Sequence, residues 1–284
     1  MYLLNILLTL LTLTHPPQTQ NEKLVAEILQ HDLLVKERAA DYERALVLVT
    51  AGTRFENRWQ VNRPVKDDQL NVFVLKAGLR NQPDLPPGLK DYFGGCTSLG
   101  EKNMVICDDA FVGTFLQKHN VPEMIKAHPD RENEWRRHNE SFLLWVLGHE
   151  IGHVVKEHGV AHFGSDTLEA NIASASIGHR RELDADAFLV EQISKSGEAS
   201  LYLTRMTLDL LNAEIKKKIG DKVPYGVGIL FDYTNKNVVR YMRLRTHPEY
   251  VVRLTRVLQK LSELEGNEGL KNLANSFAHN LREG

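Results

Sequence analysis

The feature that most constrains the fold is an apolar helical segment that runs directly into a group of polar side chains. Residues 142–147 read Phe-Leu-Leu-Trp-Val-Leu, and a helix that is apolar on nearly all sides is buried. The segment continues into His149-Glu-Ile-Gly-His153, an HExxH pattern. Buried imidazoles and carboxylates need polar partners or a metal ion. The rest of the chain must therefore supply such partners to this helix.

The HExxH pattern predicts a metal site. Positions i and i+4 lie on one face of a helix, so His149 and His153 can bind one cation, and neutral imidazole is a good zinc ligand. Glu150 lies beside that face, where it can accept a proton from a water molecule without binding the metal itself. We expect one Zn2+ ion per chain, with Glu150 as the catalytic base.

A catalytic zinc site has three protein ligands, and the third is expected downstream. Glu182 follows His153 by 29 residues, enough for a helix end, a loop and an antiparallel helix. Asp186 lies one turn further on the same face, where it can accept a hydrogen bond from the outer N–H of a ligand histidine. Asp184 and Glu169 are weaker alternatives, because neither has an acidic partner at this spacing.

Hydrophobic periodicity and turn residues predict a mostly helical chain with a few short strands. Helices are expected over residues 20–50, 108–119, 134–158, 167–194, 201–219, 248–264 and 267–282. Strands are expected over 71–75, 94–99 and 104–107. Turn-rich or irregular segments are expected over 52–68, 82–88 and 220–246.

The first fourteen residues, MYLLNILLTLLTLT, are almost entirely apolar or Thr. Their length fits the apolar part of a secretory signal or an anchor, which predicts a secreted, periplasmic or membrane-associated protein. No Lys or Arg precedes the run and no small-residue cleavage site follows it. A buried N-terminal helix or strand, in a cytoplasmic protein, is therefore the alternative.

Composition excludes two classes of protein. The net charge is −2, so the chain lacks the basic excess that nucleic-acid binding needs. No apolar run reaches about 18 residues, which excludes a multi-span membrane protein.

The chain has two cysteines, Cys96 and Cys107, on either side of an expected hairpin turn. In an oxidising compartment they could form a disulfide across the two strands if the register brings their Cβ atoms close together. Two buried free thiols are the alternative, which a cytoplasmic location would favour.

Four motifs occur in order along the chain: His149-Glu-Ile-Gly-His153, His158-Gly159, Glu182-x-x-Ala185-Asp186 and Thr246-His247-Pro248. This pattern resembles the HtpX-like zinc metallopeptidases, a group that also contains the CAAX prenyl proteases. The resemblance covers about residues 70–260. It implies an α+β, mostly helical gluzincin domain in which a small antiparallel or mixed sheet packs over the active-site helix. The edge strand of that sheet would bind an extended peptide.

The resemblance, the apolar N-terminal run and the expected helices together divide the chain into four expected parts. These are a signal or anchor segment (1–19), an N-terminal helical region (20–69), the zinc metallopeptidase domain (70–265) and a C-terminal helical tail (266–284). Two features differ from the family pattern: the segment between His153 and Glu182 is short for the family, and the multi-span membrane region of HtpX itself is absent. The short segment, Gly152 and the run from Glu182 to Phe188 also resemble the ImmA/IrrE-like peptidases, which usually have Asn where Asp186 stands. The subfamily is therefore left open.

The expected function is that of a zinc-dependent endopeptidase that acts on peptides or unfolded proteins, in protein quality control. A catalytically weak metal-binding chaperone or assembly factor on the same fold is the alternative, although only catalysis needs an intact Glu150. His247 would either stabilise the oxyanion of the tetrahedral intermediate or bind zinc in a resting state. Alternatively, it has no chemical role and only stands at the start of a helix, before Pro248. Tyr225 and Arg245 are weaker oxyanion candidates. The oligomeric state is left open.

Two further histidines, His158 and His162, follow the HExxH segment. Because they lie past the metal-binding turn, we expect them at the surface or in a layer outside the metal ligands.

Overall fold

The computed structural model describes residues 28, 34–35, 39–76, 95–99, 102–109, 129–158, 168–197, 200–201, 203–204, 206–208 and 250–282. This part of the chain has an α+β fold that is mostly helical, with a small mixed sheet. The helices are α3 (Ala39–Thr50), η4 (Pro129–Arg131), α6 (Glu132–Val155), α7 (Leu168–Ser194), α11 (Tyr250–Glu265) and α12 (Glu268–Arg282). The strands are β1 (Trp59–Val61), β2 (Leu70–Leu75), β3 (Cys96–Leu99) and β4 (Met104–Asp108).

The sheet has the strand order β1-β2-β4-β3. The β1–β2 and β2–β4 pairs are parallel, and β3 and β4 form an antiparallel pair with Leu99 opposite Met104. All residues of β2 and β4 are buried, which is typical of central strands that are covered on both faces. Strand β3 lies at one edge and is partly exposed.

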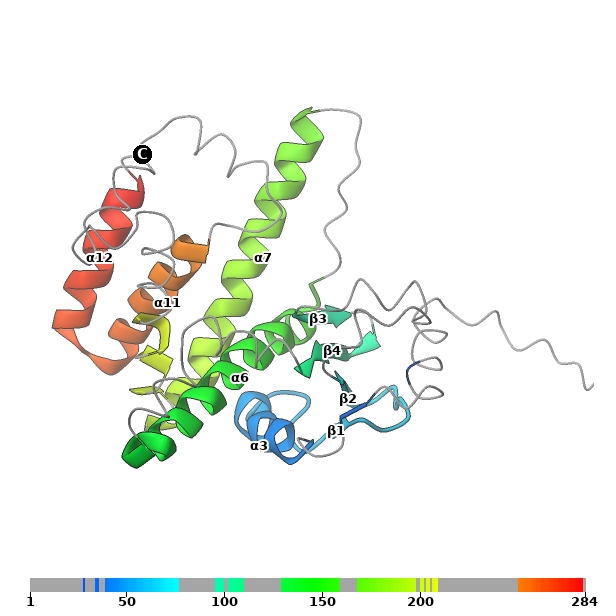
Figure 1. The fold of residues 1–284 in the computed structure, drawn as a ribbon. Coiled ribbons are helices and arrows are strands. Elements are labelled where there is room, and N and C mark those ends of the chain that lie inside the picture. Colours follow the sequence, from blue (N-terminus) through cyan, green and yellow to red (C-terminus); the bar gives the residue numbers. More distant parts are fainter. Residues whose placement is uncertain are drawn as a thin grey trace, which may run out of the picture.

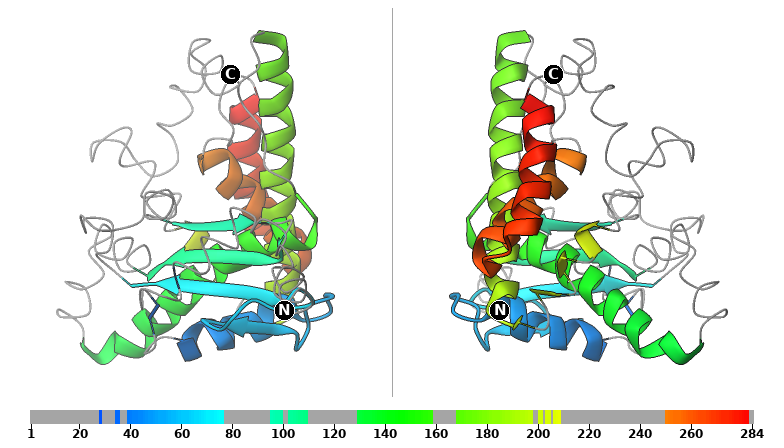
Figure 2. Two further views of the ribbon diagram at one scale, coloured as in Figure 1. Left: turned by 90° about the vertical axis from the view of Figure 1, so that its right-hand side faces the viewer. Right: turned by 90° about the vertical axis from the view of Figure 1, so that its left-hand side faces the viewer.

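Helix α6 lies at the centre of the described structure (Figure 1). It contacts β3 and β4 on the sheet, and it also packs against α3 and α7. Residues 141–149 of α6 are all buried, as the apolar sequence predicts. Helix α11 packs on α7, and α12 packs on α11. The N-terminal half of α7 extends away from the sheet (Figure 2). The core lies between the sheet, α3, α6 and α7, and it continues into α11 and α12.

The structure differs from the expected secondary structure at two places. The segment over 52–68, expected to be turn-rich, also contains β1, a strand too short to show a periodic pattern. The helix expected over 20–50 is interrupted, because Leu34 forms a β-bridge with Leu75 and the Val35 N–H donates to the Val74 carbonyl oxygen. Leu34 and Val35 thus supply backbone hydrogen-bond partners to the end of β2, past the point where β1 ends. Such partners are needed because buried backbone N–H and C=O groups must be hydrogen-bonded.

Other expected elements lie partly or wholly outside the described residues. The N-terminal apolar segment, the loop over 82–88 and the segment over 220–246 lie wholly outside. The helices expected over 108–119 and 201–219 are described at only a few positions.

Candidate metal centre

Two glycines allow α6 and α7 to approach closely. Gly148 and Gly152 lie one turn apart on α6. A Cβ atom at Gly148 would come within 2.4 Å of the Leu189 side chain on α7, so only glycine fits there without a shift. This close packing brings the middle of α7, including Glu182, to the histidine-bearing face of α6.

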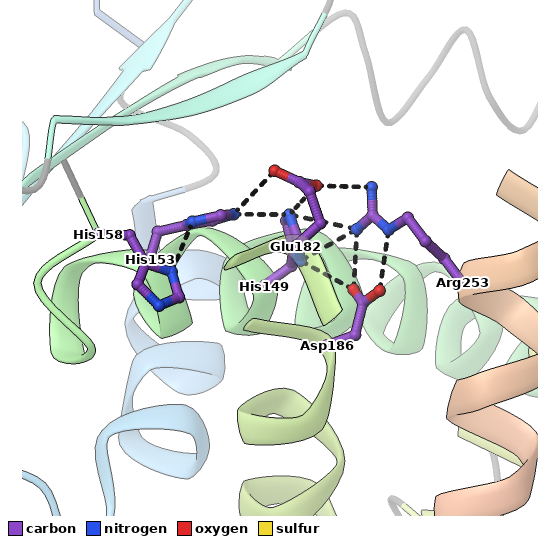
Figure 3. Close-up of polar contacts among 6 residues, drawn as sticks. All are labelled: His149, His153, His158, Glu182, Asp186 and Arg253. Carbon is purple, nitrogen blue, oxygen red and sulfur yellow. Dashed lines mark hydrogen bonds and ion pairs between the residues drawn. The ribbon is translucent and has the colours of Figure 1, made fainter. Parts of the chain in front are cut away.

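Three side chains on these helices point their polar atoms toward one another (Figure 3). His153 Nε2 lies 3.2 Å from His149 Nε2 and 3.3 Å from Glu182 Oε1. His149 Nε2 lies 3.2 Å from Glu182 Oε2. His149 and Glu182 are buried and His153 is nearly so, and together the three form a group that could hold a metal ion.

The spacing of these atoms fits a small tetrahedral cation. Metal–ligand bonds of about 2.0–2.1 Å in tetrahedral geometry separate the ligand atoms by about 3.3–3.4 Å. The distances between the ligand atoms of His149, His153 and Glu182 are close to that separation. The donor set of two imidazole nitrogens and one carboxylate also fits zinc.

Asp186 contacts the outer nitrogen of His149. Its Oδ1 atom lies 2.8 Å from His149 Nδ1, while Nε2 of the same ring faces His153 and Glu182. Burial and the charge of Arg253 disfavour protonation of His149, but the carboxylates of Asp186 and Glu182 outweigh both and raise its pKa to about 9. The two carboxylates therefore favour the protonated form of His149 when no metal is bound.

The carboxylates are held in their charged form. Burial alone would raise the pKa of Glu182, but hydrogen bonds with His149 and His153 hold it far below its usual value. Burial also opposes ionisation of Asp186, and the neighbouring guanidinium of Arg253 lowers its pKa despite this. Both side chains are therefore ready to bind a cation or to orient its ligands.

A further residue of the cluster, not predicted from the sequence, is Arg253, a buried cation on α11. It donates to both Asp186 oxygens, from Nε and from a terminal nitrogen, at 2.8 Å each. Its other terminal nitrogen lies 3.0 Å from Glu182 Oε2. The signal in the sequence is a charged residue at an apolar helical position, because the next turns of the same face carry Val257 and Leu261, which are buried.

The remaining candidates fall into two groups. Glu150 is half-buried on α6, next to His149, whereas Asp184 is exposed and does not join the cluster. His247, Tyr225, Arg245 and His162 lie outside the described residues, as does the side chain of Glu169.

His158 lies just past the end of α6, in contact with His153. Its Nδ1 atom is 3.1 Å from His153 Nδ1, and the two rings meet edge to face. The side chain is half-buried. Burial and the neighbouring His153 lower the pKa of His158 to about 4, so its ring is neutral at physiological pH.

The two cysteines form a disulfide between the edge strand and its neighbour. Cys96 and Cys107 are directly opposite each other in the β3–β4 register, with Cα atoms 4.0 Å apart. The Asp108 N–H donates to the Gly95 carbonyl oxygen, so the cysteines occupy the adjacent pair without hydrogen bonds, where Cα atoms are closest. The disulfide therefore fixes the edge strand that lies against α6.

Comparisons with known proteins found no relative of this chain. No protein-family model, curated protein or solved structure matches this chain. Among the residues that the structure describes, no helix is both long enough and apolar enough to span a membrane.

Proposed function

We propose that this chain is a zinc-dependent endopeptidase. The observation that supports this most directly is the buried group of His149, His153 and Glu182, whose ligand atoms lie at the spacing of a tetrahedral metal site. A metal site of two histidines and one glutamate leaves the fourth position for substrate or water, as in catalytic rather than structural zinc sites. The HExxH residue Glu150 lies beside this group.

The zinc ion would activate a water molecule and polarise the peptide carbonyl. Glu150 accepts the proton of the attacking water and returns it to the leaving amine, which is the usual role of a carboxylate general base. Asp186 accepts the outer N–H of His149 and so keeps Nε2 aimed into the site. His247 is proposed as an oxyanion donor on the strength of the sequence motif alone.

The position of β3 supports a peptide substrate. Strand β3 is an edge strand, it contacts α6, and it is partly exposed. An extended peptide could add to such an edge through main-chain hydrogen bonds, which depend little on the side chains of the peptide. We therefore propose peptides or unfolded proteins as substrates, consistent with a role in protein quality control.

We also propose that the chain belongs to the HtpX-like zinc metallopeptidases. The HExxH motif, the Glu182-x-x-x-Asp186 motif on an adjacent helix, and a sheet packed against the first helix support an HtpX-like gluzincin. The ImmA/IrrE-like peptidases are the lesser match, because Asp186 stands where they usually have Asn.

The test compares metal content and peptide hydrolysis in the same samples. Wild-type protein should bind about one zinc per chain and cleave casein or a peptide. Replacing His149 with Ala should remove both properties. Glu150→Gln should retain zinc but lose hydrolysis by roughly two to four orders of magnitude, because an amide cannot act as the base. Glu263→Gln, an exposed acid on α11, is the control and should match wild type.

Three results would contradict the proposal. Stoichiometric zinc in the His149→Ala protein would show that the metal binds elsewhere. Hydrolysis by Glu150→Gln at the wild-type rate would assign the activity to another site. Zinc binding by wild type without any peptide hydrolysis would favour the metal-binding chaperone or assembly factor instead.

A further inference from the structure

The end of α6 folds back so that His158 reaches the metal-ligand residue His153. The His158 N–H donates to the His153 carbonyl oxygen, and the Glu157 N–H donates to the Val154 carbonyl oxygen. Glu157 has a φ of 55°. These two hydrogen bonds and one left-handed residue define a Schellman motif, which reverses the chain direction at a helix end. In this motif the residue after the left-handed position packs against the residue five positions earlier.

In Schellman motifs this contact is frequently between apolar side chains, but here it is between two imidazoles. His158 Nδ1 lies 3.1 Å from His153 Nδ1. The other nitrogen of His153, Nε2, faces His149 and Glu182. Both ring nitrogens of His153 therefore have a contact: Nε2 faces His149 and Glu182, and Nδ1 faces His158 (Figure 3).

The two ligand histidines have different outer partners. His149 Nδ1 contacts the Asp186 carboxylate at 2.8 Å, whereas His153 Nδ1 contacts a second imidazole. A histidine that binds metal through Nε2 carries its proton on Nδ1 and usually donates it to an acceptor, which fixes the tautomer and the ring orientation. An imidazole that carries its proton on Nε2 has an acceptor lone pair on Nδ1, so His158 Nδ1 can be that acceptor at 3.1 Å.

We propose that His158 is a positioning residue for the metal centre, which accepts the Nδ1–H of His153 and so keeps His153 Nε2 aimed at the cation. This inference rests on the metal site of the proposed function. It does not require that the site cleave peptides. The rival explanation is that His158 only packs against the helix end, as an apolar residue does in other Schellman motifs.

Two substitutions separate these explanations. His158→Asn keeps an acceptor oxygen close to the position of Nδ1, whereas His158→Phe keeps a ring of similar size without an acceptor. We expect His158→Phe to weaken zinc binding about 10–100-fold and His158→Asn to stay close to wild type. Glu157→Gly is the control: glycine adopts the left-handed conformation without strain, so the turn and the zinc affinity should be retained.

The experiment measures zinc affinity by chelator competition, the visible absorption of the bound cobalt ion, and thermal unfolding of the metal-free proteins. The expected result is that His158→Phe alone loses affinity and shifts the cobalt spectrum, with metal-free unfolding unchanged. Wild-type affinity in His158→Phe would overturn the inference, as would an absence of metal binding by wild type. Metal binding by wild type without peptide hydrolysis would overturn only the proposed function.

Discussion

Gly152 in α6 lies directly against Ala185 in α7. A Cβ atom at Gly152 would lie 2.9 Å from the Ala185 carbonyl oxygen, a distance that side chains do not adopt. Glu182 is one helical turn before Ala185, so this contact sets how closely its carboxylate approaches His149 and His153. The backbone contact between the two helices thus determines the geometry of the candidate metal site formed by His149, His153 and Glu182.

Substitution of Gly152 by Val should therefore damage both stability and metal binding. The new side chain would push against backbone, which cannot move aside as a flexible side chain would, and we expect a loss of about 1–3 kcal/mol in unfolding free energy. Glu182 should move away from the histidines, so zinc affinity should also fall. Gly197→Val is the control, because the space around Gly197 is open. Equal zinc affinity in the two variants would contradict this account.

Asp186→Asn should weaken the metal site without removing a ligand. The amide is nearly isosteric but no longer offers a charged acceptor to His149 Nδ1, so zinc affinity should drop by about 10–100-fold. Glu263→Gln changes an exposed acid on α11 and should leave zinc affinity unchanged. Chelator competition measures both, and equal affinities would show that Asp186 does not orient His149.

Arg253→Met should destabilise the metal-free protein. The guanidinium neutralises the buried carboxylates of Asp186 and Glu182, and breaking a buried ion pair from one side costs about 3–5 kcal/mol. Zinc replaces part of that positive charge, so it should stabilise the variant more than it stabilises wild type. Thermal unfolding with and without zinc measures this difference. Arg256→Met, an exposed position on the same helix, should behave like wild type in both conditions.

Zinc affinity should rise with pH. The folded, metal-free protein holds a proton on His149 with a pKa of about 9, and that proton must leave before both imidazoles can bind the metal. Affinity should increase by up to about tenfold per pH unit between pH 7 and 9 and then level off. Constant affinity over this range would mean that His149 is already neutral.

The same pKa predicts the stability of the metal-free protein. The pKa of His149 is raised on folding, so its contribution is fully present below about pH 6.5 and is lost as pH rises through about 9. Denaturant unfolding of metal-free protein across this range should therefore show decreasing stability.

Reduction of the Cys96–Cys107 disulfide should lower the unfolding free energy by about 2–3 kcal/mol, as expected for a short closed loop. The double variant Cys96→Ser/Cys107→Ser should show the same loss and should not respond to a reductant. Thiol counting on protein from its native host tests the expected compartment: no free thiols indicates an oxidising one, and two free thiols indicate the cytoplasm.

The sequence by itself determined the parts of the site that depend on local spacing. His149 and His153 share a face because they are four residues apart on a helix, and Glu182 and Asp186 share a face for the same reason. The burial of α6 follows from its apolar segment. The strand expected over 71–75 follows from its β-branched and aromatic residues and the strand expected over 104–107 from the turn before it, and each observed strand is one residue longer.

Only the tertiary structure decided how these local pieces meet. The sequence does not show that Arg253, far along the chain, lies between Glu182 and Asp186, because an ion pair between helices depends on how they pack. Strand β1 is similar: its three residues form a strand because β2 offers a free edge, and not because of their own pattern. Periodicity specifies which face of an element is buried, whereas the partner of that face depends on contacts between distant segments.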